Sequence, residues 1–129
     1  MKVADYAALA DFRHALRQFL AFSEGRAGEH GLTAQQHQAL LAIRGAGGAV
    51  TVGYVAERLI LKPHSATGLV NRLAAQGLVA RQASQVDRRV ALLTLTEKAE
   101  DLLAELSATH REEIGRLRPL LIDLLDKLT

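Results

Sequence analysis

Residues 51–80 read TVGYVAERLILKPHSATGLVNRLAAQGLVA, and this stretch decides the fold. Apolar residues occur in it twice with the spacing i, i+3, i+4, i+7 and i+8, first across residues 52–60 and again across residues 66–74. That spacing places the apolar side chains on one face of a helix and leaves the other face polar. The stretch therefore predicts two short amphipathic helices in succession.

The ends of these two helices are also marked in the sequence. Thr51 precedes the first pattern, where its hydroxyl can cap the exposed backbone N–H groups of a helix. Pro63 stands where the second helix begins, a position that tolerates the missing N–H, and Gly77 stands where a left-handed helix end is favoured. Because only residues 61–62 separate them, the two helices predict a helix-turn-helix whose second helix covers residues 63–76.

Two short segments rich in β-forming residues follow the second helix. They cover residues 78–81 and 90–94, and the polar residues 82–89 lie between them. Such a pattern is typical of two strands joined by a turn. The sequence therefore predicts a β-hairpin, or wing, attached directly to the helix-turn-helix.

Helical patterns flank this core on both sides. One covers residues 4–28, a second begins after its cap at Thr33, and the last runs from Thr96 to the end with an expected break or kink near Arg118, because Pro119 removes a backbone donor. The predicted fold class is mainly α with a small β-hairpin, in a single domain of residues 1–129. It has a winged helix-turn-helix core at 32–96 and dimerisation helices in 1–31 and 97–129.

The two terminal helices each carry a long apolar stripe. A winged core of this size has too little surface to cover both stripes, so we expect them to pack on each other and on a second copy of the chain. Packing within one chain alone is the alternative. The expected interface residues of a homodimer are Leu9, Phe12, Leu16, Phe19, Leu117, Leu121, Leu124 and Leu128.

Composition excludes several classes of protein. The 129 residues include no cysteine, which rules out disulfides, thiolate zinc sites and cysteine nucleophiles. No apolar run approaches the roughly 20 residues of a membrane span, and no signal peptide is recognisable, so no membrane association and a cytoplasmic location are expected. Residues 57–89 hold six basic and two acidic residues, whereas residues 97–129 hold five basic and eight acidic ones. A basic middle beside an acidic tail is typical of a duplex-binding surface next to a non-binding element.

The outward face of helix 63–76 carries small and polar residues. Only short side chains at its N-terminal turns let a helix approach bases in the major groove. A helical glycine costs roughly 1 kcal/mol relative to alanine, so a glycine on this face suggests close contact with DNA. A merely solvated helix face is the alternative. The expected DNA-binding residues are Lys62, Pro63, His64, Ser65, Thr67, Gly68, Asn71 and Arg72, and base or phosphate contacts stay open for the last two.

The tip of the predicted wing carries Asp87, Arg88 and Arg89. The narrow, negative minor groove attracts guanidinium groups. Asp87 can hold one arginine extended through a charge-assisted hydrogen bond while the other reaches the groove or a phosphate. A surface ion pair of small energetic value is the alternative. A helix-turn-helix followed at once by such a hairpin favours double-stranded DNA as the partner.

From Leu32 to Ala99 the chain resembles the MarR family of transcription regulators. The matching stretches are residues 32–36, 51–59, 62–73, 77–79, 87–89 and 95–98. The resemblance implies an obligate dimer with intertwined first and last helices, a recognition helix that begins near Pro63, and a wing arginine in the minor groove. It further implies a repressor of transcription that binds a palindromic operator. A small phenolic or other aromatic effector would release the repressor from the DNA.

Three alternatives remain open at this point. A zinc-sensing member of the same family would need ligands where the first, second and last helices meet, but the candidates lack tight ligand spacing and we expect no metal and no cofactor. A winged helix for protein–protein contact, without DNA binding, would need an apolar outward face on helix 63–76. An enzyme is not expected, because no catalytic motif is present. The metal candidates are His14, His30, His37, His110, Glu24 and Glu29.

Overall fold

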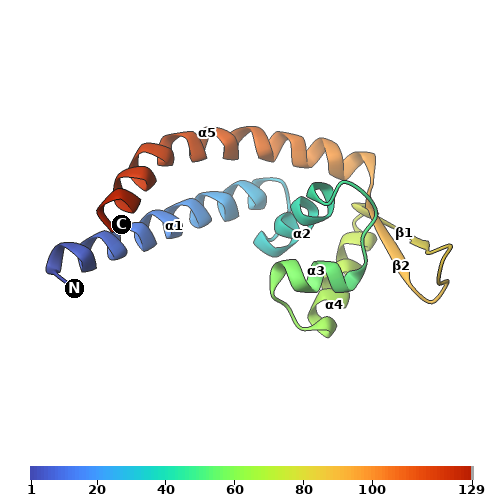
Figure 1. Cartoon of the computed structure of the whole chain (residues 1–129). Coiled ribbons are helices and arrows are strands. Elements are labelled where there is room, and N and C mark those ends of the chain that lie inside the picture. The colour runs from blue at the N-terminus through green and yellow to red at the C-terminus, as the bar shows by residue number, and fades with distance from the viewer. Residues whose placement is uncertain (129) are drawn as a thin grey trace.

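The computed structural model describes residues 1–128, and the predicted fold class is confirmed. Thr129, the last residue of the expected dimerisation segment 97–129, lies outside the described residues. Two long helices lie side by side and carry a compact group of shorter elements at one end (Figure 1). The elements are α1 (Val3–Glu29), α2 (Ala34–Gly45), α3 (Val52–Leu59), α4 (Pro63–Ala75), β1 (Val79–Ala83), β2 (Ala91–Leu95) and α5 (Glu97–Leu128).

The helix-turn-helix forms from α3 and α4 as its sequence signals predict. The Thr51 hydroxyl accepts a hydrogen bond from the backbone N–H of Tyr54 at 3.1 Å, Pro63 occupies the first turn of α4, and Gly77 follows that helix with a φ of 74°. One expectation was wrong. Ile60 does not continue the apolar face of α3, because it adopts a left-handed φ of 55° after the last helical residue and is 92% exposed. This left-handed residue ends α3 and turns the chain toward α4.

The predicted wing is an antiparallel hairpin of β1 and β2, with Arg81 opposite Leu93. Both strands lie slightly later than expected, so that residues 82–83 of the predicted turn belong to β1. A further pairing was not predicted. Val50, just before α3, exchanges both backbone hydrogen bonds with Leu93 at 3.1 and 2.7 Å. This bridge fixes the base of the wing to the helix-turn-helix.

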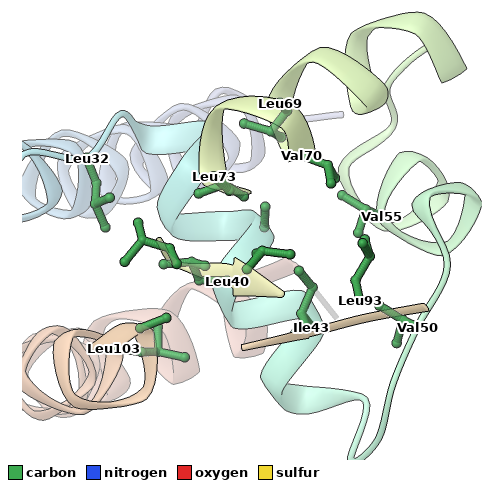
Figure 2. Packing of buried hydrophobic residues seen from close by; sticks show 14 of the residues in the cluster. Leu32, Leu40, Ile43, Val50, Val55, Leu69, Val70, Leu73, Leu93 and Leu103 are labelled. Carbon is green, nitrogen blue, oxygen red and sulfur yellow. The ribbon is translucent and has the colours of Figure 1, made fainter. Parts of the chain in front are cut away.

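One apolar core holds the winged unit and the adjoining half of α5 together (Figure 2). It draws side chains from α2, α3, α4, both strands and α5, so these elements pack on one another mainly through hydrophobic contacts. Four of the five inward positions of α4 predicted from its spacing are buried, and the fifth, Ala74, is half-buried. The largest fully buried side chains are Leu40, Val55, Leu69, Val70, Leu73, Leu93 and Leu106.

The long helices α1 and α5 pack along each other, with small residues of α1 buried and the rings of Phe19 and Phe22 in contact with His110 of α5. Ala8, Ala15 and Ala27 are the buried residues of α1, and their size lets the two helices approach closely. Of the break or kink expected near Arg118, no break occurs: α5 continues through Pro119 as a single helix, which curves toward its C-terminal end (Figure 1). Among the described residues, no helix combines the length and apolar character needed to cross a membrane.

Candidate nucleic-acid interface

The outward face of α4 is polar and accessible. His64, Ser65, Thr67 and Asn71 are exposed, whereas the alternate face of the helix is buried in the core. The Thr67 hydroxyl donates to the carbonyl oxygen of Pro63 at 3.0 Å, which holds that side chain against the helix. Lys62 and Pro63 are exposed at the start of the helix. The structure thus places these sequence-predicted residues on one accessible surface.

Gly68 lies on the same helix with room around it. A Cβ atom added at Gly68 would meet only the Arg72 Nη1 atom, at 3.6 Å, which is an ordinary contact distance. The exposed Arg72 side chain therefore lies alongside the helix near Gly68. Nothing in the protein itself requires glycine at this position.

The far end of α4 is tied to the wing and to α5. Arg81 of β1 donates through Nη2 to the Oδ1 atom of Asn71. Lys98 donates through Nζ to the carbonyl oxygen of Gln76 at 3.1 Å, and the Thr96 hydroxyl donates to that of Gly77 at 2.7 Å. These contacts fix the direction of α4 relative to the hairpin. Sequence reasoning counted Arg81 among the basic residues but did not assign it to the site.

The wing tip holds one arginine and leaves the other free. Arg89 donates to the Asp87 carboxylate from its backbone N–H at 3.1 Å, from Nε at 3.1 Å and from Nη2 at 3.2 Å. The Arg89 side-chain contacts, with that of its backbone N–H, lower the pKa of the Asp87 carboxyl from its usual value. Within residues 1–128, Arg88 is exposed and has no hydrogen bond or ion pair. The arrangement matches the division of roles expected for this turn.

The Asp87 backbone is positioned by a neighbouring serine. The Ser84 hydroxyl accepts hydrogen bonds from the backbone N–H groups of Val86 and Asp87 at 3.2 and 3.3 Å. These bonds satisfy donors that the hairpin ladder leaves unpaired at the turn. Asp87 is thereby oriented toward Arg89 rather than toward the base of the wing.

The residues expected at a dimer interface differ in how far they are exposed. Leu9 and Leu16 are 40% and 42% exposed, whereas Leu124 is only 2% exposed and packs within its own chain. Leu16 also lines an apolar cavity of about 200 Å³ between α1 and α5. The remaining expected residues, Phe12, Phe19, Leu117, Leu121 and Leu128, are half-buried.

A second apolar cavity, of about 270 Å³, lies where α1, α2 and α5 meet. His37 and His110 line it, with ring centroids 4.9 Å apart. His110 contacts the Leu106 carbonyl oxygen through Nδ1 at 2.6 Å and the Ser23 hydroxyl through Nε2 at 2.8 Å, whereas the buried Nδ1 atom of His37 has no hydrogen-bond partner among the described residues. Burial lowers the pKa of His37, and the neighbouring His110 adds to the effect.

The structure does not gather the histidines and glutamates that were considered for zinc. His30 pairs with Glu105 at 3.2 Å, and His37 meets only His110 among them. In the described part of the chain, no three His, Asp or Glu side chains are grouped as a metal site would need. The zinc-sensing alternative therefore gains no support from the geometry.

Comparisons with known proteins agree with this architecture. Residues 30–90 match the model of the MarR family. The HTH-type transcriptional repressor MdtR of Bacillus subtilis (strain 168) is 33% identical over 69 residues, which are 54% of this chain and 44% of that repressor. The match thus spans less than half of that relative's length.

Two solved structures are similar over most of the chain. YusO from Bacillus subtilis has a TM-score of 0.68 at 27% identity and is matched over 89% of this chain and 83% of its own. BpsR of Bordetella bronchiseptica, whose DNA binding is regulated by 6-hydroxynicotinic acid, has a TM-score of 0.69 at 26% identity, with 91% and 89% covered. The chain thus has a winged helix-turn-helix fold, and its residues 30–90 are similar to the MarR family.

Proposed function

We propose that the chain is a sequence-specific regulator of transcription that binds double-stranded DNA as a homodimer. Recognition helix 63–76 enters the major groove, and the wing at residues 82–89 reaches the adjacent minor groove. One observation carries the proposal: an accessible polar face on α4 lies beside a wing tip that presents the unpaired Arg88. Figure 1 shows α4 and the hairpin at the same end of the molecule, away from both termini.

The charges of the wing suit the minor groove. Arg89 is held by Asp87, so its guanidinium is fixed at the tip, while Arg88 is free to extend into a narrow groove of negative potential. The outward residues of α4 are too polar for a surface that docks another protein by hydrophobic contact. Both features favour DNA over the protein-interaction alternative.

A second copy of the chain would form the proposed homodimer. Residues 1–31 and 97–129 form its dimerisation part, and residues 32–96 form the DNA-binding core. The partly exposed leucines of α1 are available to contact the second copy. Two-fold symmetry would then place the two recognition helices about one DNA turn apart, roughly 34–36 Å, on a palindromic operator.

The regulator is proposed to be a repressor that responds to a small molecule. MdtR is a repressor by name, and the DNA binding of BpsR is regulated by 6-hydroxynicotinic acid. The cavity lined by Phe19, His37 and His110 is the candidate effector site, since much of its lining surface is apolar and since, within residues 1–128, the buried Nδ1 atom of His37 has no hydrogen-bond partner. Its size suits a small aromatic or phenolic compound.

Fluorescence anisotropy with the duplex upstream of the chain's own gene tests DNA binding. Affinity should fall linearly on a log–log plot against salt, with a slope of about −0.9 for each phosphate neutralised. Arg88→Ala should weaken binding and reduce the steepness of that slope, because the free guanidinium is lost.

Arg13→Ala is the matched control, because Arg13 is exposed on α1 and lies outside the winged core. It removes the same charge and should leave both the affinity and the slope nearly unchanged. If the two variants changed the affinity and the slope equally, the proposed contact of the wing with DNA would be contradicted. Absence of binding at low salt would contradict the proposed function and favour the protein-interaction alternative.

A further inference from the structure

The contact between Arg81 and Asn71 joins the wing to the outward face of α4. We propose that Arg81 is a positioning residue, which fixes the side-chain amide of Asn71 for its contact with DNA. The inference rests on the proposed function and deepens it, because it names a residue that sets how the recognition helix presents one of its polar groups. No feature of the helix-turn-helix motif itself requires this contact.

The alternation of side chains along β1 explains why Arg81 reaches the helix. Val79 is buried, and Arg81 lies two residues later on the same face of the hairpin, opposite the fully buried Leu93. A guanidinium cannot enter the core, so the arginine directs its charged end outward over the adjoining surface while its stem stays beside the hairpin. The adjoining surface is α4, where Asn71 is exposed.

Fixing the amide of an asparagine matters for reading bases. Its oxygen accepts and its nitrogen donates hydrogen bonds, and the two ends have nearly the same shape, so a free amide can present either one. Base edges in the major groove differ in their pattern of donors and acceptors. Because Arg81 donates to the Asn71 oxygen, the amide nitrogen is directed away from Arg81 and is presented as a donor in a fixed place.

The acceptor in this pairing, the Asn71 amide, is a neutral group. Asn71 carries no charge, so Arg81 keeps its full positive charge while it holds the amide. The guanidinium retains further N–H donors that face solvent, where a phosphate of bound DNA can be met. Arg81 can therefore contribute both attraction to the duplex and orientation of a neighbour, and the two contributions must be separated by experiment.

A double-mutant cycle separates them. Arg81→Ala, Asn71→Ala and the double variant are compared with the wild type in anisotropy titrations. Loss of the Arg81 charge should weaken DNA binding equally whether residue 71 is Asn or Ala, so this contribution cancels in the cycle. If Arg81 positions Asn71, Arg81→Ala should reduce DNA affinity about 3- to 10-fold more when Asn71 is present than when it is replaced by Ala. Arg81→Lys keeps the charge and should restore the salt slope but only part of this coupling. Additive losses would overturn the positioning role.

The free protein offers a second test that needs no DNA. Asn71 is the only asparagine in the chain, so labelling with ¹⁵N-asparagine gives one side-chain amide signal by NMR. We expect an ordered amide in the wild type and a mobile one in Arg81→Ala; equal mobility would overturn the inference. A wild type that binds no duplex would instead refute the proposed function and with it the DNA role of Arg81.

Discussion

At the scale of single residues, Gly68 is the sharpest test of how closely α4 approaches DNA. A helical glycine costs roughly 1 kcal/mol relative to alanine, and a Cβ here would meet only the Arg72 side chain at 3.6 Å. We therefore expect Gly68→Ala to raise the free energy of unfolding by about 0.5–1 kcal/mol and to weaken DNA binding, because the methyl group would occupy space needed by the duplex. Urea denaturation and anisotropy measure the two effects.

Gly25→Ala is the matched control for that prediction. Gly25 is likewise a helical glycine; it is exposed, has nothing near its absent Cβ and lies on α1, outside the winged core. It should give a similar gain in stability with unchanged DNA affinity. If Gly68→Ala also leaves the affinity unchanged, the backbone of α4 does not approach the DNA at this point.

Individual side chains show where prediction from the sequence ends. The helical spacing correctly predicted that Ala66, Leu69 and Val70 are buried, since a helix fixes which residues share a face. It could not predict the exposure of Ile60, because that spacing holds only while the helix continues. The sequence also could not predict the contact of Arg81 with Asn71, because that contact depends on the angle between the hairpin and α4.

At the scale of elements, α5 shows packing overriding a local signal. Proline removes one backbone hydrogen bond and crowds the preceding turn, which predicted a break or kink near Arg118. The helix nevertheless continues through Pro119, because residues before and after it, such as Leu106 and Leu124, remain buried against the rest of the chain. One lost hydrogen bond is a modest cost beside that burial.

The junction of α1, α2 and α5 should make folding sensitive to pH. The folded-state pKa of His37 is lowered, chiefly by burial, so the unfolded chain binds a proton before the folded chain does. The resulting stability is complete above the unfolded value of about 6.5 and is lost as the pH falls toward the folded value. We expect the free energy of unfolding to decrease between about pH 7 and pH 5, by at most about 1.4 kcal/mol per pH unit.

Urea denaturation across this pH range checks the prediction with two variants. His37→Gln should flatten the dependence, because the titrating ring is gone, although His110 on α5 still faces the same cavity with Arg111 beside it. His14→Gln is the control, since His14 is an exposed histidine of α1 and should leave the slope as it is. A wild type equally stable at pH 5 and pH 8 would show that burial of neutral His37 does not control stability.

At the scale of the whole molecule, the sequence predicted that α1 and α5 would be apolar partners but not which residues would join them. The prediction named large residues of the α1 stripe, of which Phe19 contacts His110 of α5, yet the fully buried residues of α1 include Ala8 and Ala15. Alanine occurs both in cores and on surfaces, so a helical pattern cannot show whether an alanine is buried. The consequence is that Leu9 and Leu16 stay partly exposed and are free to meet a second copy.

Oligomeric state in solution tests that consequence. Light scattering after size exclusion should give twice the 14.0 kDa mass of one chain for the wild type. Leu16→Asp should shift the mass toward one chain, because it would bury a charge in the interface without a partner. Ile60→Asp is the control: it also replaces an exposed apolar residue, but in the turn between α3 and α4, where aspartate tolerates the left-handed backbone. It should remain dimeric. A wild type with the mass of one chain would mean that the apolar stripes are satisfied within a single protomer, and two half-sites could then no longer be bound by one molecule.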